Sequence, residues 1–162
     1  MRYLILFLSV LVIFASCTKQ TVDVPQSKQD MLIAAKWRLV SIQLTVRDTF
    51  GRDSSYSWDL DNCKTDDNLE FKANFQGIHH SGDMRCYYNE NSDYAFTWQL
   101  FDNGKTLGLY NLDDFFLGAN SVKGDISDLD GNKFTLKTTQ YLGGPIPATD
   151  TLKFTKFSFI KS

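Results

Sequence analysis

Apolar and polar residues alternate along most of the chain from residue 36 onward. The clearest runs are 69–75, 94–100 and 134–137, in which every second residue is apolar. Successive side chains of a strand point to opposite faces of its sheet, so each run predicts a strand with one buried and one exposed face. The pattern predicts eight strands near 37–48, 67–77, 83–89, 93–102, 105–112, 119–128, 133–141 and 150–160, and it allows an extra hairpin arm at 53–60.

In two of these strands the apolar residues change sides. Within 37–46 the apolar positions switch from odd to even numbers, and within 152–159 they switch from even to odd. One extra residue in a β-bulge restores such a pattern. Because bulges are expected where a sheet bends round to close, both switches favour a closed sheet.

The connections between the predicted strands fall into two classes. Tight turns are expected at 78–82, 102–104 and 130–132, whereas 49–66, 113–118 and 142–149 are longer and 90–92 is a short link. In an up-and-down meander, alternate connections lie at opposite ends. We therefore predict an all-β fold, an eight-stranded up-and-down antiparallel β-barrel with a narrow floor and a loop-rich mouth. Ser27 and Asp30 have the spacing of a capping box and begin a short N-terminal helix at the floor end.

The first 26 residues have a different pattern. A basic start is followed by an apolar run at 4–15, interrupted only by Ser9, which is too short to cross a bilayer and is typical of a secretory signal. Its end, FASC at 14–17, resembles a bacterial lipobox, in which the cysteine is lipidated and becomes the first mature residue. An ordinary signal peptide with a chance cysteine is the alternative. We expect a signal peptide at 1–16, a lipidated Cys17 with a flexible tether at 17–26, and one domain at 27–162.

A lipidated Cys17 determines where the protein resides. Acyl chains add about 0.8 kcal/mol per buried CH₂, so a multiply acylated cysteine anchors a protein stably to a membrane. The expected location is the cell envelope, at the outer membrane. No acidic cluster follows Cys17, so the periplasmic and surface faces both stay open.

Two further cysteines, Cys63 and Cys86, belong to the predicted domain. Disulfides persist outside the cytoplasm, and closing a loop of about 24 residues contributes roughly 3.4 kcal/mol. Two free buried thiols are the alternative. If the bond forms, it pins the first long connection against the predicted strand at 83–89.

Short motifs occur in an order that resembles the lipocalin-like domain of bacterial lipoproteins. These motifs are LIAAKWRL at 32–39, CKTDD and LEF at 63–71, Gly77, Cys86, and WQL followed by DNGKTL at 98–107. The resemblance covers roughly 30–160 and implies a lipocalin-like barrel, a cell-envelope address and pairing of the two cysteines, but no reaction. The chain departs from the wider lipocalin pattern at Ala35, where glycine is usual, and in its last strand, which offers lysines in place of an arginine.

Composition and motifs exclude several classes of function. The net charge of −2 supplies no basic face for nucleic acid. The adjacent His79 and His80 point to opposite faces, so an exposed floor turn is expected there rather than a metal site. The stretch 128–132 lacks the glutamate that completes a calcium loop and is expected to be a hairpin turn. With no GxSxG, HExxH or phosphate-binding loop, we expect no enzyme activity, cofactor or metal. The acidic cluster Asp59, Asp61, Asp66 and Asp67 is expected to be solvated turn residues.

Two functions remain. In the first, the lipoprotein holds a small apolar ligand in its barrel; in the alternative, a filled barrel serves as a protein-interaction module that contacts another envelope protein. The loop residues 115–117 are a lid, a partner contact or a cluster folded inward. The residues expected to line a ligand cavity are Phe71, Phe75, Phe96 (or Tyr94), Trp98, Phe134 and Phe154.

Overall fold

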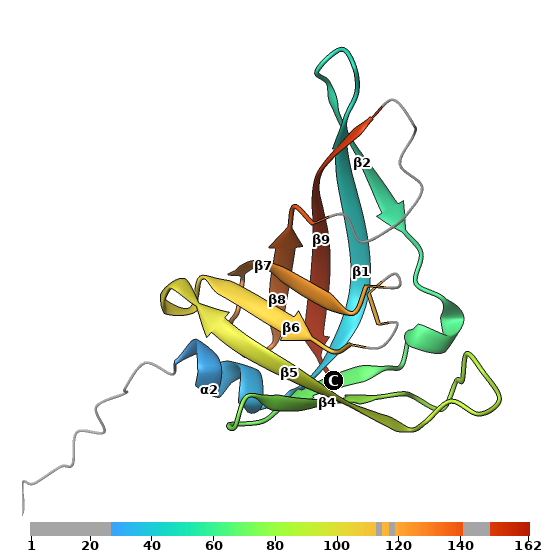
Figure 1. The fold of residues 1–162 in the computed structure, drawn as a ribbon, viewed down its shortest axis with the longest axis vertical. Helices are drawn as coiled ribbons and strands as arrows, with labels where there is room; N and C mark the ends of the chain where they lie inside the picture. Colours follow the sequence, from blue (N-terminus) through green and yellow to red (C-terminus); the bar gives the residue numbers. More distant parts are fainter. Residues whose placement is uncertain (1–26, 113–114, 117–118, 141–149) are drawn as a thin grey trace, which may run out of the picture.

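The computed structural model describes residues 27–112, 115–116, 119–140 and 150–162 (Figure 1). The predicted signal peptide, Cys17, the tether and Leu117 lie outside the described residues. The described part contains the short helix α2, the 3₁₀ turns η2 and η3, and nine strands. Their bounds are α2 (Lys28–Ile33), β1 (Lys36–Arg47), β2 (Asp53–Trp58), η2 (Asn62–Lys64), β3 (Asn68–Phe71), β4 (Gln76–His80), β5 (Asp93–Phe101), η3 (Asp102–Gly104), β6 (Thr106–Tyr110), β7 (Ser121–Ser127), β8 (Lys133–Thr138) and β9 (Thr151–Lys161). No helix in these ranges is both long and apolar enough to span a membrane.

Eight strands close into an antiparallel barrel. The sheet order is β2-β1-β3-β4-β5-β6-β7-β8-β9, and β1 also pairs with β9 along its other edge. On its first edge, β1 pairs with β3 at residues 36–37 and with β2 at residues 42–47. The closed barrel therefore contains every strand except β2. This arrangement confirms the predicted all-β, up-and-down barrel with a short helix and an extra hairpin arm.

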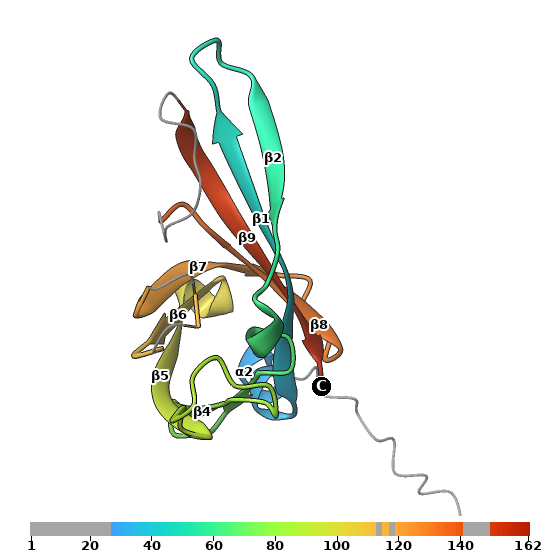
Figure 2. The same cartoon turned by 90° about the vertical axis from the view of Figure 1, so that its right-hand side faces the viewer.

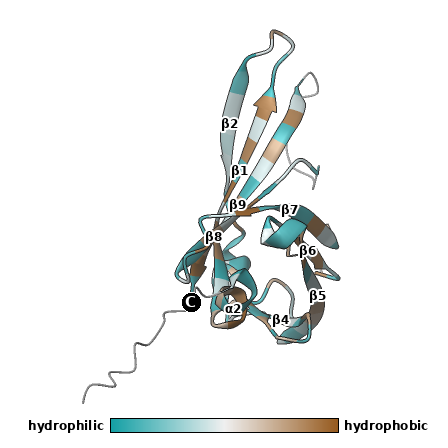
Figure 3. Ribbon diagram, turned by 90° about the vertical axis from the view of Figure 1, so that its left-hand side faces the viewer, coloured by the Kyte–Doolittle hydropathy of each residue, from teal (hydrophilic) through white to brown (hydrophobic). Residues whose placement is uncertain are grey.

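The arm consists of β2, residues 42–47 of β1 and residues 151–155 of β9. It extends the sheet beyond the barrel, at the top of Figures 1 and 2. Hydrophobic and hydrophilic residues alternate along β1 and β9 in the arm, whereas β2 has no hydrophobic band (Figure 3). Both predicted bulges lie in the β1–β9 ladder, where the register shifts between Leu39 and Ser41 and again between Thr45 and Val46.

The predicted strands at 67–77 and 83–89 are wrong. The first is a hairpin, because Lys72 N–H donates to Gln76 O (2.9 Å) and Phe75 N–H donates to Lys72 O (3.1 Å). Phe75 closes this turn at φ 62°, in the left-handed region where glycine or asparagine is usual. Residues 83–89 belong to the long β4–β5 connection and form no strand. The barrel still has eight strands. The predicted strand at 67–77 is divided between β3 and β4, and the predicted strand at 83–89 is absent.

The barrel has a floor and a mouth, as predicted, and one of the three predicted floor turns is wrong: the turn lies at 72–75 instead of 78–82. The three tight turns at the floor are 72–75, 102–104 and 128–132. Helix α2 packs there: Lys28 Nζ donates to Gly104 O (2.8 Å), and the buried Trp37 indole donates to Leu32 O (2.8 Å). The predicted capping box between Ser27 and Asp30 is present.

Candidate functional site

Four of the predicted ligand-lining residues lie inside the barrel. Phe71, Phe96, Trp98 and Phe134 are only 0–2% exposed. The Phe71 ring meets the other three edge-on, with centroids 5.5 Å from Phe96, 5.3 Å from Trp98 and 6.5 Å from Phe134. These are the distances of rings in direct contact, so the Phe71 ring touches each of the other three.

Ring contacts continue from this group toward both ends of the barrel. At the floor side Trp37 lies 5.0 Å from Phe134, and Phe134 stacks on Phe159 at 4.4 Å. Toward the mouth Phe159 meets Phe116 at 6.3 Å, and Phe116 meets Phe115 at 4.9 Å. A side chain that lines a ligand-sized cavity keeps surface that water can reach, and the four interior rings above keep almost none. Side chains therefore fill the barrel around these rings.

Two other predicted lining residues point away from the interior. Phe75 is 45% exposed in the β3–β4 turn, and its ring centroid lies 5.4 Å from that of Trp98. Phe154 is half-buried, and Lys137 Nζ lies 3.8 Å from its ring centre. Phe154 and the buried Thr155 are neighbours in β9 and point to opposite faces. The bulge lies at Lys153, before Phe154, and not between Phe154 and Phe157, where the apolar positions change sides. The expected interior positions of Phe75 and Phe154 are wrong.

The mouth residues Phe115 and Phe116 fold inward. Both are buried, and the Phe115 ring lies 4.8 Å from the His79 ring. The segment 115–117 was expected to be a lid, a partner contact or a cluster folded inward, and the last of these is correct for Phe115 and Phe116. They leave no exposed aromatic patch at positions 115 and 116.

The two histidines lie at the mouth end of β4, and the expected exposed turn at the floor is wrong. Their side chains do point to opposite faces. His79 is buried, whereas His80 lies outside, 2.6 Å from an Asp93 oxygen and 2.8 Å from a Glu70 oxygen. The error follows from the misplaced hairpin, because the turn is at 72–75 and β4 runs from it toward the mouth.

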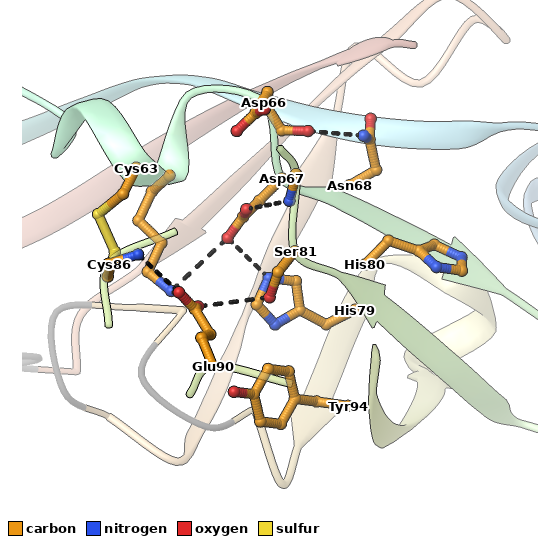
Figure 4. Close-up of polar contacts among 12 residues, drawn as sticks. Cys63, Asp66, Asp67, Asn68, His79, His80, Ser81, Cys86, Glu90 and Tyr94 are labelled. Carbon is orange, nitrogen blue, oxygen red and sulfur yellow. Dashed lines mark hydrogen bonds and ion pairs between the residues drawn. A yellow bond between two sulfur atoms is a disulfide. The ribbon is translucent and has the colours of Figure 1, made fainter. Parts of the chain in front are cut away.

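A buried ionic cluster joins the mouth connections (Figure 4). His79 Nε2 donates to Asp67 Oδ2 (2.8 Å), and Gly82 N–H donates to Asp67 Oδ1 (2.9 Å). Lys64 Nζ lies 3.6 Å from Asp67 Oδ2 and 3.3 Å from Glu90 Oε1. Asp67 is fully buried, so the expectation that it is a solvated turn residue is wrong. Asp59 and Asp61 are exposed, as expected.

The two carboxylates of the ionic cluster are held in their charged form. Burial raises the pKa of Asp67, but the hydrogen bonds from His79 and Gly82 outweigh burial and lower it below its usual value. The pKa of Glu90 is lowered in the same way, because the Cys86 N–H and Lys64 outweigh its burial. Charge-assisted hydrogen bonds of this kind are about twice as strong as neutral ones.

The disulfide between Cys63 and Cys86 is present, with the Cα atoms 5.1 Å apart. It links η2 to the β4–β5 connection, not to a strand at 83–89. Asp66 supports the same junction, because its Oδ2 accepts from the N–H groups of Asp83 (2.8 Å) and Met84 (3.3 Å). The bond, which confirms the predicted pairing, and the ionic cluster thus fasten the same two connections. No local sequence pattern indicates the ionic cluster.

The ionic cluster lacks the parts of a hydrolytic site. Nδ1 of His79 is buried and has no hydrogen-bond partner, and the ring lies between Tyr94 and Phe115. The nearby Ser81 hydroxyl donates to Glu90 (3.4 Å) rather than to His79. Within the described ranges, no group of three or more His, Cys, Asp or Glu side chains is arranged to hold a metal ion. The arrangement fastens loops; it activates no nucleophile among these residues.

An open groove of about 450 Å³ lies where β1 changes partner from β3 to β2. No sequence pattern indicates this groove, because it depends on the bulge at Val40 and on the place where two distant strands meet. Trp58 and Leu60 contribute apolar surface, and Asp59 contributes a carboxylate. The full lining is Val40, Ser41, Ile42, Ser57, Trp58, Asp59, Leu60, Asn62 and Thr65.

Comparison with known proteins adds no name to this site. No protein-family model matches the sequence, and no curated protein is similar enough to count as a match.

Proposed function

We propose that the protein is a lipid-anchored, non-enzymatic interaction module of the bacterial cell envelope. In this proposal the segment 1–16 directs export, Cys17 carries the lipid at the outer membrane, and 17–26 tethers the barrel. The barrel is a rigid scaffold, and its partner is a protein of the same envelope.

The filled interior is the observation that carries this choice. Phe96, Trp98 and Phe134 each contact Phe71, and all four are 0–2% exposed, so an apolar ligand would have to displace packed rings. The free energy needed to open the core would reduce the affinity for such a ligand. This favours the interaction module over the ligand carrier.

The arm is the surface that we assign to the partner. It extends the sheet beyond the barrel, and β2 forms the outer edge (Figures 1 and 2). Tyr56 on β2 is 47% exposed, and Val40 and Phe50 are exposed nearby. Exposed apolar side chains beside an unpaired strand edge are typical of a protein-binding surface.

A fluorescence titration distinguishes the two functions. Delipidated protein is titrated with fatty acids and with an apolar dye, and Trp98, at the centre of the packed rings, reports on the interior. We expect no saturable shift in Trp98 emission. A saturable shift that disappears in Trp98→Phe would overturn the filled-scaffold proposal and restore the ligand carrier.

A further inference from the structure

The outer edge of β2 presents unpaired backbone groups. In the β1–β2 hairpin, Asp48 N–H donates to Arg52 O (3.0 Å), which fixes the alternation of bonded pairs along the ladder. Ser54, Tyr56 and Trp58 therefore bond to β1. The other three residues of the strand alternate with these. They are Asp53, Ser55 and Ser57, and their N–H and C=O groups point away from β1.

This edge lacks the features that usually keep strand edges apart. Natural edge strands are protected by lysine, proline, a bulge or a covering segment. Residues 54–58 read SSYSW, with no charge, proline or glycine, and the β1–β2 ladder has no register shift. All of β2 is exposed except Trp58, which is half-buried. The edge is thus ready to accept another strand.

The charges at the two ends of β2 are opposite. At its start, Arg47 and Lys153 bind Asp53 and hold its pKa at about 2, and the Arg52 side chain is 74% exposed. Together with Asp48, this end has three positive groups (Arg47, Arg52 and Lys153) and two negative groups (Asp48 and Asp53). At its other end, Asp59 and Asp61 are two exposed negative groups. A strand that runs antiparallel to β2 and has the same sequence brings opposite charges together.

We propose that β2 pairs with β2 of a second copy of this chain, antiparallel, about a two-fold axis at Ser55. This inference rests on the proposed function and names the partner of its arm. Only Asp53, Ser55 and Ser57 offer outward backbone groups, so Ser55 meets Ser55 of the second copy and Asp53 meets its Ser57. Arg52 then lies opposite Trp58 of the second copy, where a guanidinium and an indole attract each other.

Neighbouring registers are less favourable. A shift that puts Ser55 opposite Ser57 of the second copy also puts Asp53 opposite its Asp59, and two carboxylates in that position repel. A shift the other way shortens the overlap. The register centred on Ser55 combines the longest pairing with unlike charges.

The pairing is weak in solution and is supported by the membrane. One six-residue strand edge buries less than the roughly 1,200 Å² of a stable interface. Two lipid-anchored copies share one surface, and confinement raises their effective concentration. We therefore expect dimers of the full chain in the envelope.

Cysteine crosslinking in the envelope tests the register. Ser55→Cys and Ser57→Cys are each made in the full chain, and an oxidant is added to intact cells. Directly opposite residues of a bonded antiparallel pair have Cα atoms about 5.5 Å apart, within the range of a disulfide. In this register Ser57 of one copy faces Asp53 of the other. The two Ser57 residues are therefore four positions apart along the strand, which is too far for a disulfide. We expect S55C alone to shift to twice the monomer mass on a non-reducing gel.

The matched control makes each outcome decisive. Both variants keep Cys17, Cys63 and Cys86, so a crosslink through those residues appears in both. Equal dimer yields from S55C and S57C, or none from either, overturn the self-pairing. Crosslinks to a different protein also overturn it, but they leave the interaction module standing. The proposed function fails separately, by a saturable Trp98 response.

Discussion

The floor and the mouth of the barrel are fastened by different chemistry. At the floor, hydrogen bonds hold helix α2 in place: the Ser27 hydroxyl accepts from the Asp30 N–H, the Trp37 indole donates to Leu32 O, and Lys28 Nζ donates to Gly104 O. At the mouth, ionic contacts join two connections: His79 bonds to Asp67, and Lys64 bonds to Glu90. Turns and a helix therefore form the floor, whereas a disulfide and buried charges hold the mouth. We expect the mouth to be the more easily disrupted end.

The largest effect is expected when Asp67 is replaced by alanine. This change leaves His79 and Lys64 beside a gap in a buried ionic cluster, and breaking one partner of a buried pair costs about 3–5 kcal/mol. Urea unfolding measures the loss. The control Asp59→Ala, at an exposed site, stays within about 0.5 kcal/mol of the parent. Equal stabilities for the two variants would contradict a fastening role for the cluster.

The disulfide is expected to rank second. Replacing Cys63 and Cys86 by alanine, or reducing the bond, removes about 3.4 kcal/mol in the chain-entropy model. Hydrogen exchange locates the change: the β4–β5 connection at 81–92 loses protection, while α2 keeps it. Thiol labelling of the unreduced, denatured mature protein checks the bond itself. Two reactive thiols from Cys63 and Cys86 there would refute it.

The same comparison explains how much of the molecule its sequence predicts. The period of two along β5 and β8 predicted strands, because alternation is a local property that the sheet obeys. The turn at 72–75 was missed, because Phe75 continues the alternation and yet adopts a left-handed conformation. Asp67 and Glu90 lie in polar stretches that read as solvated loops. Their burial depends on Lys64 and His79, which only the folded chain brings to them.

The aromatic interior shows the same limit. The face of β5 predicted that Phe96 and Trp98 point inward, and both do. Whether inward rings line a cavity or fill it depends on which rings meet across the barrel, as Phe71 on β3 and Phe134 on β8 do at 6.5 Å. That is a property of strands that are not neighbours in the sheet. The position of the bulge matters as well: it lies at Lys153, before Phe154, so Phe154 is on the face opposite to Phe157 and Phe159.

Acid is expected to weaken the mouth. Asp67 and Glu90 have lower pKa values in the folded protein than their usual 3.8 and 4.5, despite burial. The charged forms therefore favour folding. Their contribution is present above those usual values and is lost as the pH falls through the lower folded values. Urea unfolding between pH 3 and 7 should show this decline, and Asp67→Asn should flatten it. If the unfolding free energy of Asp67→Asn depended on pH as strongly as that of the parent protein, Asp67 would not contribute to the sensitivity to acid.

The smallest effect is expected at the floor, from Ser27→Ala. The Ser27 hydroxyl accepts from the Asp30 N–H (3.1 Å), and the Asp30 carboxylate accepts from the Ser27 N–H (3.3 Å), so the change removes half of a capping box. Loss of an N-cap costs about 1 kcal/mol. Helix α2 is only six residues long and depends on packing, so the loss should appear as faster hydrogen exchange in α2 with little change at 81–92. Ser54→Ala, on the exposed strand β2, is the control and should alter neither region. If Ser27→Ala loosened the mouth as much as the helix, the two ends would unfold as one unit, and their different fastening would not divide the barrel into separately stable parts.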